Sequence, residues 1–279
     1  MMRTNRLMGV VLALLGLSGS TGSAQSVLAN LLERHGVQVK GGNLEAAFDA
    51  HAGPTVPLTP GAFATPIAIL TTSGARESDR ADAAFAFAIL AGRSGRAASP
   101  QELAAAGQAL VVMIASSDRR ARITGARVSG RLFAAPFDKS GVRPVVPAGT
   151  TEGLYALLNR DSQVEQLAAM DAIGLLREAS AVSSLSERYQ FYRQSGNRAL
   201  AGGALEALAR IGDPSSIDVV RQLTGDKWAD GKDATSLAVA FARERLLRDG
   251  SIATIQQALE DKRRNQARGY LFELGAPVP

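Results

Sequence analysis

Any metal or hydrolase site in this chain would depend on two histidines. The sequence contains no Cys, and His35 and His51 are its only histidines. Zinc sites are built from clustered His, Cys and carboxylate ligands, and Glu33 and Asp49 are the carboxylates nearest to the two histidines in sequence. Each histidine, however, falls near the end of a short predicted helix, where a partial positive charge is favourable. We therefore predict neither a metal site nor a catalytic residue.

Sequence signatures of other chemistry are also missing. No Gly-x-Ser-x-Gly elbow, Walker-type loop or dinucleotide fingerprint lies between a predicted strand and a predicted helix. Residues 226–233 contain three Asp and a Gly, as calcium loops do, but they lack the alternate-position ligands and the distal Glu. This segment is predicted to be a polar turn, with Trp228 partly covering a joint between helices. We expect no cofactor and no enzyme activity.

The chain does contain side chains suited to binding. The densest aromatic and cationic patch is formed by Arg188, Tyr189, Phe191, Tyr192 and Arg193. Arg and aromatic residues dominate the energetics of protein interfaces, although Phe191 and one of the tyrosines could equally belong to the core.

Basic residues form two further groups that could contact an anionic partner. A solvated helix face is the alternative explanation for both. The first group lies on one helical face and the second near the C-terminus: Arg120, Arg127 and Arg131, then Lys262, Arg263, Arg264 and Arg268.

The N-terminus has the order of a secretory signal peptide. Arg3 and Arg6 precede an uncharged apolar run over residues 7–17, and small residues end at Ala24. The apolar run is shorter than the roughly 20 residues that a membrane span needs, so we predict cleavage after Ala24 and a periplasmic or secreted protein that does not span the membrane. Cleavage would lower the net charge from +5 to +3. A nucleic-acid partner is not expected outside the cytoplasm.

The remaining chain is predicted to be helical. Two short helices are expected at residues 26–35 and 43–51, followed by an extended, Pro-rich segment at 53–75. Helices separated by Gly, Asp, Pro and Ser follow from Asp79 onward. The predicted organisation is thus a signal peptide (1–24), short helices with an irregular segment (25–78) and a helical domain (79–279).

An internal repeat with a period of 35 residues organises the C-terminal half. Apolar or small residues coincide when the sequence is shifted by this period: Val182, Ile217 and Ile252; Leu185, Val220 and Ile255; Leu176, Ile211 and Leu246; Ala172, Ala207 and Ala242; Ala169, Ala204 and Val239. Fixed periods of this length are typical of α-solenoids, in which each unit buries its apolar face against the next. The sequence therefore predicts an all-α solenoid.

Each copy of the repeat is predicted to be a helical hairpin. In the clearest copy, Gly212 ends the first helix, Asp213 caps the second and Pro214 suits its first turn. An earlier unit has a long loop over residues 135–150, and a looser unit precedes it with a helix at 81–91 and a capping box at Ser99. A half-unit at residues 263–274 closes the series, which gives about five hairpins.

The residues from Leu208 to Ile217, continuing to Val220 and Leu223, resemble HEAT repeats in their short bacterial form. The resemblance covers residues 118–260 well and 80–117 loosely. Tetratricopeptide repeats have a similar period, but this chain lacks their Gly near Arg221 and their aromatic residue near Thr224. The resemblance implies a curved scaffold that holds other proteins on a concave face lined by the second helix of each hairpin.

These observations favour a periplasmic interaction scaffold for a protein partner. The 35-residue register places its expected concave-face residues on successive second helices: Arg188, Tyr192, Arg221, Gln222, Gln256 and Gln257. One alternative is a cell-envelope binder of a small ligand or glycan, with the Pro-rich segment and the 135–150 loop as a clamp. Another is an accessory subunit or a lyase-like enzyme, since some HEAT-like bacterial proteins are chromophore lyases.

Overall fold

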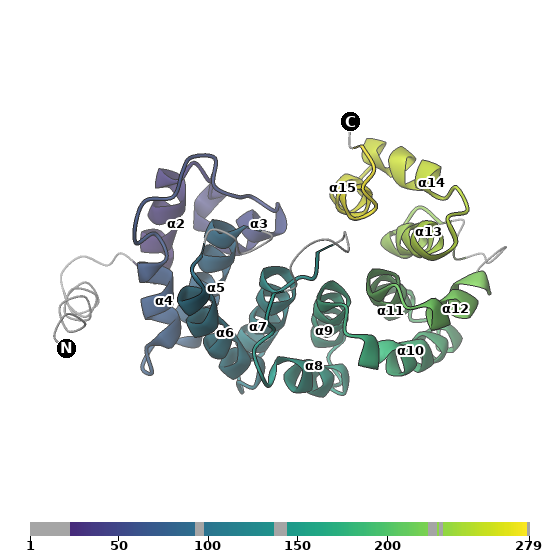
Figure 1. Cartoon of the computed structure of the whole chain (residues 1–279), viewed down its shortest axis with the longest axis horizontal. Helices are drawn as coiled ribbons and strands as arrows, with labels where there is room; N and C mark the ends of the chain where they lie inside the picture. Colours follow the sequence, from purple (N-terminus) through teal and green to yellow (C-terminus); the bar gives the residue numbers. More distant parts are fainter. Residues whose placement is uncertain (1–22, 93–97, 137–143, 223–227, 229–230, 278–279) are drawn as a thin grey trace. The chain divides into compact units, whose positions relative to one another are not determined.

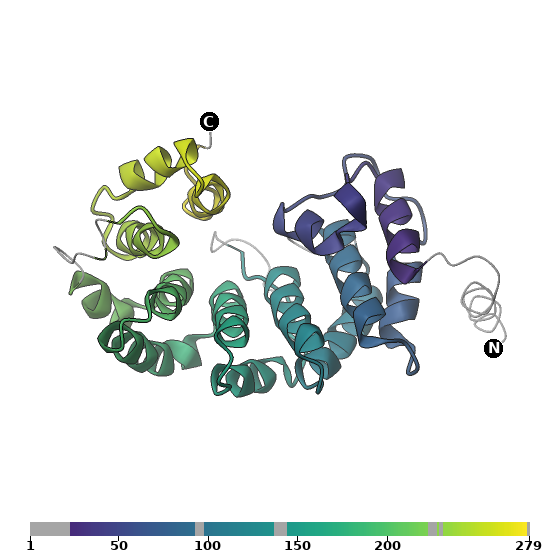
Figure 2. The same cartoon turned by 180° about the vertical axis from the view of Figure 1, so that it is seen from behind.

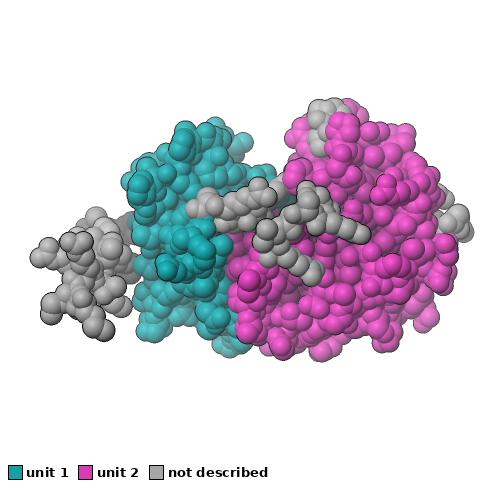
Figure 3. Space-filling model, viewed as in Figure 1, with its two compact units in different colours: residues 1–125 teal, residues 126–279 magenta. Residues whose placement is uncertain are grey.

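A computed structural model describes residues 23–92, 98–136, 144–222, 228 and 231–277. All regular secondary structure in these residues is helical (Figure 1). The predicted signal peptide falls almost wholly on residues 1–22, outside the described ranges. None of the helices described is long and apolar enough to cross a membrane. The chain divides into two compact units, residues 1–125 and 126–279 (Figure 3).

The first unit is built around one buried helix. Its helices are α2 (Ala24–Arg34), α3 (Leu44–Asp49), α4 (Ala64–Thr71), α5 (Glu77–Ala91) and α6 (Pro100–Ile114). Helices α2, α3 and α4 all pack on α5, in which every residue from 81 to 91 is buried.

Aromatic pairs join the shorter helices to α5. The ring centroids of Phe48 and Phe85 lie 5.1 Å apart, and those of Phe63 and Phe87 lie 5.2 Å apart. Residues on both sides of the predicted boundary between residues 78 and 79 therefore pack in one core.

Two local predictions in this unit have different outcomes. The predicted capping box is confirmed, because Ser99 Oγ accepts from the Glu102 backbone N–H and the Glu102 carboxylate accepts from the Ser99 N–H. The extended segment predicted over residues 53–75 is wrong for α4. Pro66 lies in the first turn of that helix, where its missing N–H has no intrahelical acceptor to satisfy.

The second unit begins within α7 (Arg119–Leu132) and contains eight further α-helices in the residues described. They are α8 (Thr150–Leu158), α9 (Gln163–Leu176), α10 (Val182–Gln194), α11 (Arg198–Ile211), α12 (Ile217–Arg221), α13 (Ala234–Leu247), α14 (Ile252–Gln257) and α15 (Arg264–Glu273). Short 3₁₀ turns precede α10, α12 and α15: η2 (Ala179–Ala181), η3 (Pro214–Ser216) and η4 (Ala258–Glu260).

Helices of the second unit pack against their near neighbours. Helix α8 packs on α9, α10 packs on α11, and α13 packs on both α12 and α14. Helix α11 also lies between α9 and α13. Figures 1 and 2 show α9, α11 and α13 as an inner row on the inside of this unit's curve, with α8, α10, α12 and α14 as an outer row.

Three of the predicted apolar columns form the centre of this unit. Their members are all 0 % exposed: Ala169, Ala204 and Val239; Ala172, Ala207 and Ala242; Leu185, Val220 and Ile255. The first two columns belong to the inner row and the third to the outer row. The 35-residue period therefore corresponds to buried contacts between successive helices.

Small residues bring the inner helices close together. A Cβ added at Gly130 would lie 2.6 Å from Ala172 Cα, and one added at Gly174 would lie 2.8 Å from Ala207 Cα. Helices on the inside of a curve must lie closer than those on the outside, and only small side chains permit such an approach.

The predicted turn after each inner helix is also present. Helices α9, α11 and α13 end at Arg177, Gly212 and Arg248, whose φ angles of 51°, 71° and 53° are all left-handed. Asp213 and Asp249 then accept hydrogen bonds from the backbone N–H of the serine two residues further on. These carboxylates satisfy donors at the start of the next helical segment.

Candidate functional site

The aromatic patch of α10 divides into buried and exposed members. Tyr189 is 0 % and Tyr192 5 % exposed, whereas Phe191 is 65 % exposed. The rings of Phe191 and Tyr192 pack at an interplanar angle of 66°, with centroids 5.6 Å apart. Both tyrosines thus belong to the core, and the phenylalanine, which could have been a core residue, points to the surface.

Arg188 and Tyr192, four residues apart on α10, lie together. Arg188 donates to Tyr192 Oη at 3.4 Å and to Asn159 Oδ1 at 2.6 Å. Tyr192 Oη in turn donates to Gln166 Oε1 at 3.2 Å. The guanidinium of Arg188 is therefore held by Tyr192 and by Asn159 at the end of α8, and Tyr192 is itself held by Gln166 of α9. Phe191 follows Arg188 by three residues on α10, a spacing at which residues are neighbours on a helix surface.

The other predicted partner-binding residues are distributed along the outer row. Gln222, at the end of α12, accepts a 3.3 Å hydrogen bond from Gln190 of α10. Arg221 is exposed and pairs with Asp218 of its own helix at 3.0 Å. Gln256 and Gln257 are exposed on α14.

The outer row does not line the concave side of the second unit. Figure 1 places α10, α12 and α14 on the outside of the curve and α9, α11 and α13 on its inside. The expectation that these six residues form a concave face is corrected accordingly. The repeat period indicates which helices are equivalent, but it does not indicate which row faces inward. The inward row is the one whose helices approach closely at Gly130 and Gly174.

Several residues of the predicted basic groups are engaged within the protein. Arg120 donates to Asp82 Oδ1 of α5 at 2.9 Å. Burial raises the pKa of Asp82, and the positive charge of Arg120 opposes that rise. Arg263 is bidentate to Asp261, and Arg264 donates to the Leu259 carbonyl at 2.7 Å.

The remaining basic residues differ in exposure. Arg127 and Arg131 of α7 are half-buried, whereas Lys262 and Arg268 are exposed. The side chain of Arg263, by contrast, is only 10 % exposed. The basic groups are therefore no uniform surface, and Arg120, Arg263 and Arg264 are engaged in contacts within the protein.

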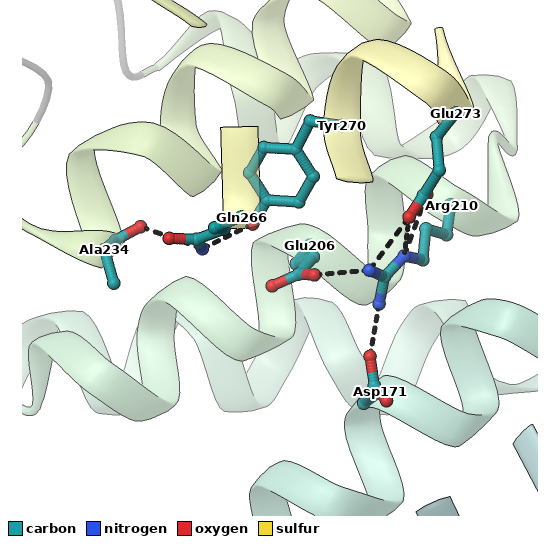
Figure 4. Close-up of polar contacts among 7 residues, drawn as sticks. All are labelled: Asp171, Glu206, Arg210, Ala234, Gln266, Tyr270 and Glu273. Carbon is teal, nitrogen blue, oxygen red and sulfur yellow. Dashed lines mark hydrogen bonds and ion pairs between the residues drawn. The ribbon is translucent and has the colours of Figure 1, made fainter. Parts of the chain in front are cut away.

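A buried ionic cluster, which the sequence analysis missed, is the most concentrated arrangement of charge described in the second unit. Figure 4 shows Arg210 of α11 surrounded by Asp171 of α9, Glu206 of α11 and Glu273 of α15. The closest nitrogen–oxygen distances are 2.5, 2.6 and 3.0 Å respectively. The guanidinium side chain is only 9 % exposed.

Burial and like charges shift the protonation of this cluster. Burial raises the pKa of Glu206, as do the negative charges of Asp171 and Glu273, while Arg210 lowers it. Burial alone would lower the pKa of Arg210, but the three carboxylates raise it well above its usual value. Arg210 therefore stays charged and forms ion pairs with all three acids, so the cluster positions helices and leaves no guanidinium edge for a ligand.

Tyr270 extends the cluster toward α13. Its ring stacks on Phe241 with centroids 4.2 Å apart and an interplanar angle of 13°. Gln266 donates to Tyr270 Oη at 2.8 Å. Burial raises the pKa of Tyr270 well above its usual value, and the nearby Glu206 raises it further. The tyrosine hydroxyl is thus a neutral hydrogen-bonding group that helps to fix α15 on α11 and α13.

The two histidines occupy separate places in the first unit. His35 is 3 % exposed at the end of α2, with Nε2 3.5 Å from Thr59 Oγ1. His51 is exposed beyond α3, with a φ of 54° and Nδ1 2.7 Å from the Asp49 carbonyl oxygen. Within the ranges described, no three His, Cys, Asp or Glu side chains are grouped to hold a metal ion.

Trp228 lies at the joint where the sequence predicted it. The guanidinium of Arg198, at the start of α11, lies 5.0 Å from the centroid of its ring. Arg198 also donates to Asp233 Oδ2 at 2.9 Å, and Asp233 caps α13. Burial alone would raise the pKa of Asp233, but hydrogen bonds from Arg198 and Ser236 lower it. Residues 226, 227, 229 and 230 of the predicted polar turn lie outside the described ranges.

The chain was compared with protein families and with curated proteins. No family model matches it, and no curated protein matches it in sequence. The structure itself shows an all-helical protein whose helices pack with their near neighbours in two compact units.

Proposed function

We propose that this protein is an exported, non-catalytic scaffold of the HEAT-like kind that binds a protein partner. The buried 35-residue columns and the near-neighbour packing of helices support a solenoid in the second unit. The charged and apolar order of the N-terminal sequence supports export to the periplasm or beyond.

The partner site is proposed on the outer surface of α10, around Phe191. The single observation that carries this assignment is the 65 % exposure of the Phe191 ring on a helix whose tyrosines are buried. An exposed aromatic ring beside a positioned arginine has the composition of an interface hot spot. Arg188 is already held by Tyr192 and Asn159, so binding would cost little side-chain entropy.

Substitution of Phe191 tests this site with little risk to the fold. Phe191→Ser removes an exposed ring, and exposed substitutions of this kind change stability by about 0.5 kcal/mol or less. The matched control is Phe272→Ser on α15, because the Phe272 ring is likewise exposed, at 50 %.

The assay is capture of the protein from its own cell envelope after mild cross-linking, followed by affinity measurement with the protein recovered. We expect Phe191→Ser to weaken that affinity at least about tenfold, as loss of a hot-spot residue does, and Phe272→Ser to leave it unchanged. Equal binding by the two variants would contradict the site. Recovery of a small molecule without any protein partner would contradict the scaffold function itself.

A further inference from the structure

Helix α15 is a short helix that packs on η4 and α14 and reaches the inner row through specific side-chain contacts. It has ten residues, fewer than the roughly 12–15 that an isolated helix needs to be even marginally stable in water. Tyr270 stacks on Phe241 of α13, and Glu273 forms two parallel hydrogen bonds with Arg210 of α11. The helix therefore depends on its packing against η4, α14 and the inner row.

The charges beneath α15 are unbalanced. Arg210 already pairs with Asp171 and Glu206 from the inner row, and docking of α15 adds the Glu273 carboxylate to the same guanidinium. Tyr270 is the other titratable group that faces Glu206 in this cluster. Three carboxylates then surround one cation, so ionisation of all three leaves a net negative charge in a largely buried place.

Docking and protonation are consequently linked. Burial and the charges of Asp171 and Glu273 raise the pKa of Glu206 in the docked state, against the opposing effect of Arg210 and Tyr270. Undocking of α15 removes Glu273 and uncovers Glu206, so the pKa of Glu206 falls back toward its ordinary value. The docked state thus binds more protons than the undocked state, and its stability is lost as pH rises through the raised pKa.

We infer that α15 is a pH-responsive latch on the inner row, docked more firmly in acid and released more often as pH rises. Its release uncovers Phe241 of α13 together with the Arg210 cluster of α11. This face lies on the opposite row from the surface proposed around Phe191, and the latch operates whether or not that surface binds a partner.

Hydrogen exchange of the purified protein measures the latch directly. Amides of α15 are compared with those of α11 in the same sample at several pH values from 5 to 8, so that the intrinsic pH dependence of exchange cancels. We expect the equilibrium constant for opening of α15, relative to that of α11, to rise at least about threefold across this range. One linked proton permits at most about tenfold per pH unit.

Glu206→Gln is the decisive variant, because Gln has the same shape and cannot ionise. We expect it to remove the pH dependence, with α15 better protected than in the natural protein at pH 8. Glu187→Gln on α10 is the matched control and should retain the natural response.

Intact protection of α11 shows that each variant is folded, and Glu273→Gln provides a second neutral substitution in the cluster. A pH-independent opening of α15, or the same response in Glu206→Gln as in the natural protein, overturns the latch.

Discussion

Substitution of Gly174 by alanine tests the close approach of α9 and α11. Alanine would place its Cβ 2.8 Å from Ala207 Cα, a backbone atom that cannot rotate away. Gly269 in α15 has no heavy atom within 4 Å of the corresponding position, and it is therefore the matched control. The two substitutions make the same chemical change within helices but meet different surroundings.

The expected magnitudes follow from these surroundings. Replacing a helical glycine by alanine gains about 0.5–1 kcal/mol when space is free. Forcing an extra methyl group into a close-packed contact costs about 1–3 kcal/mol. Gly269→Ala should therefore stabilise the protein by about 0.5–1 kcal/mol, and Gly174→Ala should be about 1–3 kcal/mol less stable than Gly269→Ala.

Urea unfolding monitored by helical circular dichroism measures both changes on the whole chain. A stabilisation of the same size in both variants would refute the packing described for α9 and α11. Gly130→Ala repeats the experiment at the contact between α7 and α9, since its Cβ would lie 2.6 Å from Ala172 Cα.

Three further predictions concern turns and charges, and urea unfolding measures each of them. Arg248→Gly should stabilise the protein by about 0.5–1 kcal/mol, because relief of the left-handed backbone outweighs the added freedom of the unfolded chain, whereas Gly212→Ala should destabilise it. Arg210→Met should cost about 3–5 kcal/mol, because it leaves buried carboxylates without their cation, whereas the exposed Arg221→Met should cost about 1 kcal/mol or less. The lowered pKa of Asp233 in the folded protein stabilises it above the ordinary aspartate pKa, and this contribution is lost as pH falls through the lowered value. Asp233→Asn should thus reduce the loss of stability between about pH 5 and pH 2, and an unchanged acid slope would contradict this role.

The sequence was a good guide wherever the structural cause is local. Helix ends follow from caps and turn residues, and the contacts of Ser99 and Asp213 are those expected from their neighbours. Three of the five apolar columns of the 35-residue period are fully buried because equivalent positions on successive helices meet the same environment, as Ala172 and Ala207 do. Helix α4 was not predicted because a proline breaks a helix at most positions. Pro66 is tolerated because it lies in the first turn of α4.

The candidate surface was only partly predictable. The sequence singled out Arg188 and Tyr192, which lie together, but it could not tell that Phe191 is exposed while both neighbouring tyrosines are buried. Glu206 and Arg210 are four residues apart on one helix, and that pair was readable from the sequence. Glu273 was not, because 63 residues separate it from Arg210.

The amino-acid sequence by itself determined that the chain is helical, where capped helices such as α6 begin, and which positions recur through the second unit. Only the tertiary structure decided which row faces inward and where α15 docks. Helix formation and capping depend on neighbours within a few residues, whereas the inward row depends on how closely Gly174 can approach Ala207. The docking of α15 depends on a guanidinium and a carboxylate that meet only once the helices between them have packed.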